Sequence, residues 1–124
     1  MKEVLIVDDS QTVRRELSEG LKQAGFGVVE AGDGISGLER ASERDFALII
    51  LDVNMPRMNG LDMLDHLHRD PKTAKTPVVL LTTEAEPALM DRARQAGAKG
   101  WLIKPVPITH IVKTARALAK QAER

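Results

Sequence analysis

Four short apolar segments of this chain each end in acidic, hydroxyl or cationic side chains. They read VLIVDD (residues 4–9), ALIILD (47–52), VVLLTT (78–83) and WLIKP (101–105). The apolar runs are rich in Val, Ile and Leu and show no polar alternation, which is typical of strands buried on both faces of a parallel sheet. We therefore predict strands at these segments and a shorter, more polar strand at 28–31.

Segments with helical periodicity follow each predicted strand. Ser10 is placed to cap the first helix, Gly97 to stop the fourth, and Pro107 suits the first turn of the last. The apolar residues that mark the five helices are Val13, Leu17, Leu21 and Ala24; Ile35, Leu38 and Ala41; Leu61, Leu64 and Leu67; Leu89, Ala93 and Ala96; and Ile108, Ile111, Val112, Ala115, Leu118 and Ala119. Strict alternation with short connections predicts an α/β fold of five β-α units, a doubly wound parallel sheet covered by helices on both faces.

Length and composition narrow the class of protein. At 124 residues the chain fits one domain, and no linker or repeat divides it, so we expect a single domain over 1–124 with no output domain. The net charge is zero, which favours neither nucleic acid nor an anionic membrane surface. Cysteine is absent, and only four apolar residues precede Asp8, too few for a signal peptide. We expect a cytoplasmic monomer.

The polar residues at the strand ends predict a single pocket. In open parallel sheets, functional groups gather beyond the carboxyl ends of the strands. Asp8, Asp9, Asp52, Thr82 and Lys104 should therefore converge. Three carboxylates that meet there raise one another's pKa unless a cation relieves the repulsion, and with no His or Cys among the converging residues the preferred ion is Mg²⁺. Mg²⁺ and an ammonium group beside a carboxylate nucleophile suit phosphoryl transfer.

At these residues the chain resembles the receiver domain of two-component response regulators, in particular the stand-alone chemotaxis type. The match covers the whole chain, and DVNMPRMNG (52–60) is its most specific segment. The resemblance implies a flavodoxin-like sheet of strand order 2-1-3-4-5. It also implies a cis peptide bond between Lys104 and Pro105.

The resemblance also implies a role for each site residue. Asp52 matches the phospho-accepting aspartate, Thr82 the switch hydroxyl and Lys104 the phosphate-binding lysine. Asp9 is expected to bind Mg²⁺ directly, Asp8 partly through water, and the backbone carbonyl of Asn54 completes the metal ligands. The side chains of Asn54 and Glu84 lie where family members influence water attack on the acyl phosphate. Each motif alone also fits an ordinary turn, cap or strand residue; their joint occurrence in order favours the site.

A partner face is expected around the fourth helix, the fifth strand and the fifth helix. Trp101, the only tryptophan, occupies a position where family members commonly carry a rotating Tyr or Phe. It is either that switch or a surface tryptophan packed over the fourth helix. Pro87, Met90 and Arg94 share one face of that helix, and Met90 also fits a partly buried core position.

The resemblance implies that the protein takes a phosphoryl group from a histidine kinase or phosphotransfer domain and then binds a downstream target protein. Chemotaxis-like control of a motor is one reading, and an intermediate or sink in a phosphorelay is the other. Two different classes remain as alternatives. One is a haloacid-dehalogenase-type phosphatase, against which Asp8-Asp9-Ser10 and the short chain argue. The other is an adaptor that works without phosphorylation, against which the complete pocket argues.

Overall fold

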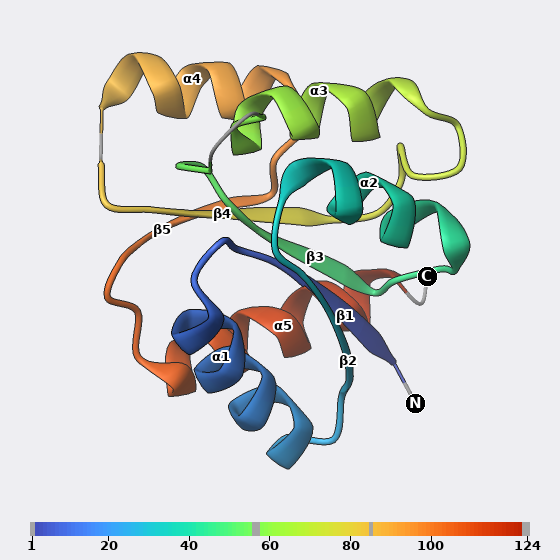
Figure 1. Ribbon diagram of the computed structural model, residues 1–124, viewed down its shortest axis with the longest axis vertical. Coiled ribbons are helices and arrows are strands. Elements are labelled where there is room, and N and C mark those ends of the chain that lie inside the picture. The colour runs from blue at the N-terminus through green and yellow to red at the C-terminus, as the bar shows by residue number, and fades with distance from the viewer. Residues whose placement is uncertain (1, 56–57, 85, 123–124) are drawn as a thin grey trace.

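The computed structural model describes residues 2–55, 58–84 and 86–122, and in these ranges five parallel strands alternate with five helices (Figure 1). The elements are β1 Glu3–Val7, α1 Gln11–Gln23, β2 Gly27–Ala31, α2 Gly34–Glu43, β3 Leu48–Asp52, α3 Gly60–Arg69, β4 Val78–Thr82, α4 Pro87–Gln95, β5 Gly100–Ile103 and α5 Ile108–Ala122. The β-α alternation read from the sequence is confirmed, with strand ends within one or two residues of the predicted segments.

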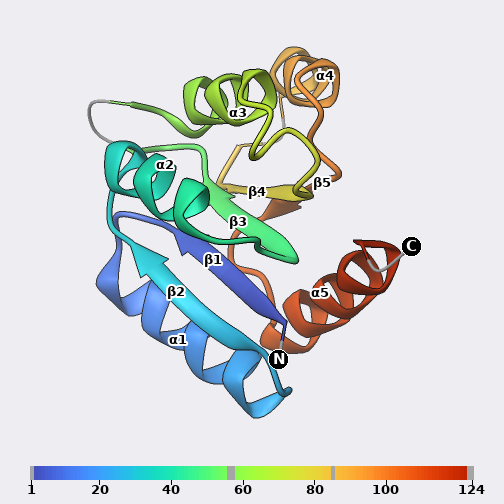
Figure 2. The ribbon, with the colours of Figure 1, turned by 90° about the vertical axis from the view of Figure 1, so that its right-hand side faces the viewer.

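The strands form one sheet in the order β2-β1-β3-β4-β5. All four pairings are parallel, so the carboxyl ends of the strands lie along the same edge. Helices α1 and α5 cover one face and α2, α3 and α4 cover the other (Figure 2). This is the doubly wound, flavodoxin-like arrangement that the sequence predicted.

The core divides into two apolar layers, one on each face of the sheet. Its centre is β1, β3 and β4, whose apolar side chains are at most 3% exposed. The prediction of burial on both faces is wrong for the fifth strand. β5 is an edge strand with partly covered residues, and Ile103 is 42% exposed, because β4 is the one strand that pairs with it among the described residues.

Helix ends are set by local capping chemistry. The Ser10 hydroxyl accepts the Val13 N–H at 3.2 Å, as the sequence predicted. Asp33 and Asn59 cap α2 and α3 in the same manner. Gly97 follows α4 with a φ of 97°, a left-handed backbone conformation that glycine adopts readily at the end of a helix. Pro107 lies one residue before α5 rather than in its first turn, and its carbonyl oxygen accepts the Ile111 N–H at 3.2 Å.

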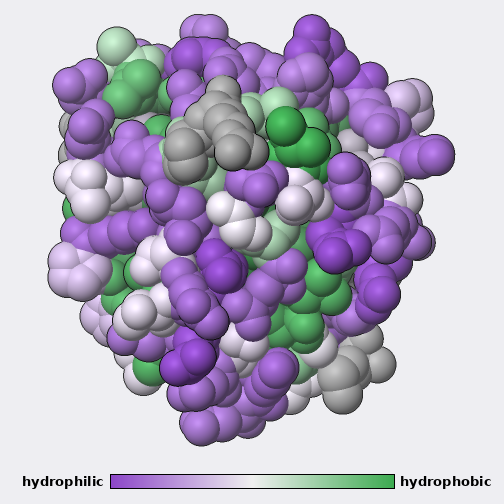
Figure 3. All heavy atoms as spheres, in the orientation of Figure 1, coloured by the Kyte–Doolittle hydropathy of each residue, from purple (hydrophilic) through white to green (hydrophobic). Residues whose placement is uncertain are grey.

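Hydrophilic side chains cover most of the face shown in Figure 3, and the apolar groups on it are small and separate. Within the described ranges, no helix is both long enough and apolar enough to span a membrane.

Gly60 shows how closely helix α3 approaches the end of β3. A Cβ at Gly60 would collide with the backbone carbonyl oxygen of Asp52 and with the Val53 Cα, 2.8 Å away. We expect Gly60→Ala to lower the free energy of unfolding by about 2 kcal/mol or more, because backbone atoms cannot move aside as a flexible side chain does. Urea unfolding followed by circular dichroism measures the effect.

Gly100→Ala is the matched control. A Cβ there would meet Val79 Cγ2 at 3.4 Å, an ordinary contact. Its stability should change by less than about 0.5 kcal/mol. Equal stability of Gly60→Ala and the wild type would show that α3 can move away from β3.

Candidate functional site

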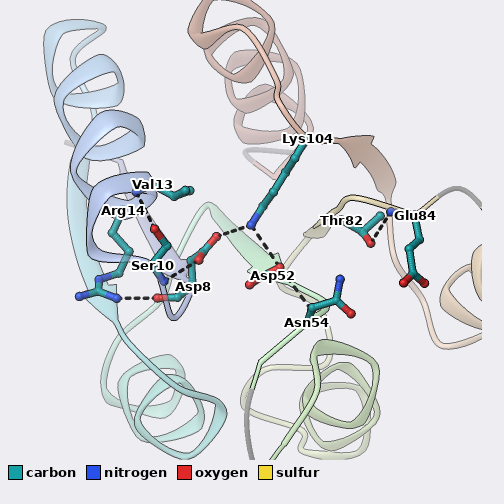
Figure 4. Close-up of polar contacts among 9 residues, drawn as sticks. All are labelled: Asp8, Ser10, Val13, Arg14, Asp52, Asn54, Thr82, Glu84 and Lys104. Carbon is teal, nitrogen blue, oxygen red and sulfur yellow. Dashed lines mark hydrogen bonds and ion pairs between the residues drawn. The ribbon is translucent and has the colours of Figure 1, made fainter.

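Four of the polar residues predicted to converge lie together at the carboxyl edge of the sheet: Asp8, Asp52, Thr82 and Lys104 (Figure 4). Asp8 follows β1, Asp52 is the last residue of β3, Thr82 is the last of β4 and Lys104 follows β5. Because these strands run in parallel, their ends bring residues from four parts of the sequence into one pocket.

Three carboxylates form the acidic part of this pocket. One oxygen from each of Asp8, Asp9 and Asp52 lies within 4.8 Å of the others. Asp8 and Asp52 are buried, at 1% and 3% exposure, whereas Asp9 is exposed. Carboxylates this close repel one another when all are ionised, so the cluster needs nearby positive charge.

Lys104 provides that charge within the protein. Its Nζ lies 2.9 Å from Asp8 Oδ2 and 3.3 Å from Asp52 Oδ1. Lys104 and Pro105 are joined by a cis peptide bond, as the sequence comparison implied. The lysine therefore bridges the two buried carboxylates directly.

Burial and mutual charge shift the pKa of both partners. Burial, with the Asp8 charge adding to it, raises the pKa of Asp52 to about 6, although Lys104 and the Asn54 N–H act in the opposite direction. Burial alone lowers the pKa of Lys104, but its hydrogen bond to Asp8 and the negative charges of Asp8 and Asp52 outweigh burial and raise it. Lys104 is thus held in its charged form, whereas burial makes the ionised form of Asp52 less favourable.

The backbone around Asp8 holds its side chain firmly. Its Oδ1 accepts the Ser10 N–H at 2.9 Å, and its own N–H donates to the Ala31 carbonyl at 3.1 Å. Asp52 Oδ1 accepts the Asn54 N–H at 3.3 Å. Both carboxylates are therefore fixed before any ligand arrives, which lowers the entropic cost of binding one.

The donor set fits a hard divalent cation. The cluster consists of carboxylate oxygens, and one of the three residues, Asp9, is open to solvent. Mg²⁺ prefers oxygen ligands and keeps several waters, so a site with one exposed side suits it better than a closed cage. Asp8, Asp9 and Asp52 are the side chains placed to hold such an ion.

Known proteins similar to this chain identify its family. The family model described as the response regulator receiver domain matches residues 4–116. The chain belongs to the receiver domain family. It is 42% identical over 106 residues to a protein named as a probable chemotaxis protein CheY of Rhizobium etli, covering 85% of this chain and 82% of that protein. It is 38% identical over 103 residues to chemotaxis protein CheY-3 of Vibrio cholerae, covering 82% and 79%.

Solved structures give the same result. The receiver domain superposes on chemotaxis protein CheY4 of Vibrio cholerae with a TM-score of 0.90 and 37% identity, covering 95% of this chain and 98% of that one. A CheY-like receiver domain protein from Methanospirillum hungatei has a TM-score of 0.93 at 24% identity, covering 99% and 97%, and so shows the shared fold alone. The chain is a signalling domain of the CheY type.

Thr82 and Glu84 are joined at the end of β4. The Thr82 side chain is fully buried, and its Oγ1 accepts the Glu84 N–H at 3.1 Å. The Glu84 side chain is exposed, as is that of Asn54 after β3. These are the two positions predicted to affect water attack, and the structure places both on the solvent side of the pocket.

Trp101 contacts the same loop from β5. Its indole Nε1 donates to the Glu84 carbonyl oxygen at 3.3 Å, and its ring is half-buried against the layer that includes Leu89 and Ala96. The backbone of Glu84 thus contacts Thr82 through its N–H and Trp101 through its carbonyl oxygen. Trp101 packs beside α4, as one of the two sequence interpretations proposed, and it also contacts the loop that follows Thr82.

The predicted partner residues are only partly brought together. Met90, Arg94 and Trp101 line a depression of about 300 Å³ between α4 and β5. Met90 is half-buried and Arg94 is exposed. Pro87 is exposed in the first turn of α4 and does not line this depression.

Sequence reasoning missed Arg14, which contacts the acidic loop. Its Nη1 donates to the Asp8 backbone carbonyl at 2.6 Å, as Figure 4 shows. An arginine one turn into an amphipathic helix normally points to solvent, and the bond to a main-chain atom leaves no pattern in the sequence. Its position one turn after the Ser10 cap was the available signal.

The raised pKa of Asp52 predicts a pH-dependent effect of Asp52→Asn on stability. In the metal-free wild type, the unfolded carboxyl ionises near 3.8 and the folded one near 6, so stability falls as the pH rises between these values. Asp52→Asn removes that cost. Its free energy of unfolding should exceed that of the wild type by up to about 3 kcal/mol above pH 6, and the two should converge near pH 4.

The measurement is chemical unfolding of metal-free protein from pH 4 to pH 8. Asp45→Asn, at an exposed aspartate, is the control and should differ little from the wild type across this range. A stability difference between Asp52→Asn and the wild type that does not change with pH would contradict the ionisation cost.

Proposed function

We propose that this receiver domain accepts a phosphoryl group on Asp52 from a histidine kinase or a phosphotransfer domain. The observation that carries the proposal is Lys104, whose ammonium group contacts buried Asp8 and Asp52 beside a third carboxylate. Such an arrangement places a nucleophile, a cation site and an ammonium group within one pocket, as phosphoryl transfer requires.

Asp52 has one oxygen available for attack on phosphorus. Both contacts recorded for its carboxylate within the described residues involve Oδ1. Oδ2 forms the new P–O bond, the P–N bond to the donor histidine breaks, and its electron pair returns to the imidazole, which takes up a proton. Lys104 and the Thr82 hydroxyl then neutralise and hold the phosphoryl oxygens.

The acidic residues would hold Mg²⁺ during this transfer. Asp8, Asp9, Asp52 and the Asn54 backbone carbonyl are the proposed ligands. When bound, Mg²⁺ would neutralise charge on the phosphoryl oxygens and the nearby carboxylates. Asn54 and Glu84 stand at the solvent side, where their side chains orient or exclude the water that removes the phosphoryl group.

The output is binding of a downstream target at the α4-β5-α5 face. Relatives named as chemotaxis proteins support chemotaxis-like signalling as the pathway. The path to the surface is short, because the two backbone groups of Glu84 contact Thr82 and Trp101. Movement of Thr82 toward a phosphoryl group must break or shift the Glu84 N–H bond, which alters the surroundings of the indole. A shift between two such arrangements changes the affinity for a partner.

Intact mass spectrometry tests the acceptor. With Mg²⁺ and acetyl phosphate as donor, the wild type should gain one phosphate that hydroxylamine removes, as an acyl phosphate requires. Asp52→Asn should gain none, while Asp45→Asn should match the wild type. An adduct of wild-type yield in Asp52→Asn would refute the assignment.

Trp101 emission tests the output, since this is the only tryptophan. Mg²⁺ with beryllofluoride, a mimic of the bound phosphoryl group, should change the emission more than Mg²⁺ alone does. Thr82→Ala should lose this response while still binding beryllofluoride, and Thr83→Ala, at the exposed neighbouring threonine, should retain it. Unchanged wild-type emission, with binding confirmed by calorimetry, would show that the indole does not follow the phosphoryl group.

A further inference from the structure

Arg14 joins three parts of the molecule beside the acidic pocket. From helix α1 its Nη1 donates to the Asp8 carbonyl at 2.6 Å, and its Nε lies 3.3 Å from Glu30 Oε1 at the end of β2. Its side chain is only 18% exposed. Gly32 lies beside the guanidinium, and a Cβ there would make only an ordinary contact with Arg14 Nη1, at 3.4 Å. The arginine is therefore held in place rather than extended into solvent.

The carboxylate of Asp9 lacks recorded contacts of this kind within the described residues. Within the described residues, the structure records no hydrogen bond or ion pair to its carboxylate, although one oxygen lies within 4.8 Å of the Asp8 and Asp52 oxygens. The position of Asp9 must then follow from the backbone that precedes it. The peptide that joins Asp8 to Asp9 has its carbonyl oxygen held by Arg14.

If the peptide between Asp8 and Asp9 rotates, Asp8 stays in place, so the rotation moves Asp9. The N–H, Oδ1 and Oδ2 of Asp8 are each engaged, by Ala31, Ser10 and Lys104 respectively. Loss of the Arg14 contact would free only the carbonyl, and the peptide would turn on its Asp9 side. That rotation carries the Asp9 carboxylate away from the other two.

We propose that Arg14 is a positioning residue for the divalent cation site, acting through the Asp8–Asp9 peptide with Glu30 as its anchor. The inference rests on the proposed function, because it assumes that the three carboxylates bind Mg²⁺. The ligand is the cation itself, and Arg14 does not touch it.

The charge of Arg14 gives positioning and simple electrostatic repulsion opposite effects on Mg²⁺ affinity. A guanidinium near a cation site repels the cation, so removing it should tighten Mg²⁺ binding if charge were its only effect. Positioning predicts the opposite sign, because a misplaced Asp9 weakens the site. Replacing a residue that orients a metal ligand without binding the metal typically changes the metal affinity by about tenfold or more.

Calorimetric titration of the full chain with Mg²⁺ separates the two effects. Arg14→Gln should raise the dissociation constant about tenfold relative to the wild type. Arg15→Gln, which removes the same charge from the exposed neighbour on α1, should leave it unchanged or lower it. Arg14→Lys keeps the charge but cannot contact both the Asp8 carbonyl and Glu30 as a fork, so its affinity should fall between the two.

Amide hydrogen exchange of the metal-free proteins gives a second readout that needs no ion. Arg14→Gln should speed exchange at the Asp9 and Ser10 amides, and Arg15→Gln should not. Mg²⁺ binding by Arg14→Gln as tight as in the wild type would overturn the inference while leaving the proposed function intact. Failure of the wild type to bind Mg²⁺ would overturn both. If Arg14→Gln does not fold, an Arg14→Lys affinity equal to that of the wild type would overturn the inference, and a weaker one would support it.

Discussion

Two buried carboxylates share one ammonium group, and the rest of the pocket is arranged around that contact. Asp8 and Asp52 come from β1 and β3, which are neighbours in the sheet, whereas Lys104 follows β5 at its edge. An unpaired buried charge is costly, so neither carboxylate is stable there without a cation. The long lysine side chain reaches past β4 to provide one.

The strand order explains why the space exists at all. Helix α1 leaves β1 toward one face of the sheet, and the segment after β3 leads to α3 on the other face. Between two neighbouring strands whose connections diverge, a crevice opens at the carboxyl edge. Asp8, Asp9 and Asp52 stand on either side of that crevice. The acidic cluster therefore occupies a place on this edge where the backbone itself leaves room for a ligand.

The sequence predicted the elements and the convergence because both depend on periodicity and on parallel strands ending together. Its errors lie where the context of the sheet decides. Ile103 looks like any buried strand residue, yet β5 lies at the edge of the described sheet and exposes it. Contacts made through backbone atoms were equally hidden: the Arg14 bond to the Asp8 carbonyl and the Trp101 bond to the Glu84 carbonyl depend on loop conformation. For Arg14, the sequence signal was limited to its position one turn after the Ser10 cap.

At the pocket, a buried polar residue stands at or directly after the end of three strands, and an exposed residue follows it within two positions. Asp8, Asp52 and Thr82 are at most 3% exposed, and the exposed residues after them are Asp9, Asn54 and Glu84. The inner residues are held by the sheet, which keeps their geometry constant, while the outer ones stand where ions, water and partners arrive. Preorganised groups act most strongly where water is excluded. A site at this boundary combines a fixed interior with an accessible exterior, which explains why the chemistry sits at the strand ends rather than within the sheet or on the helices.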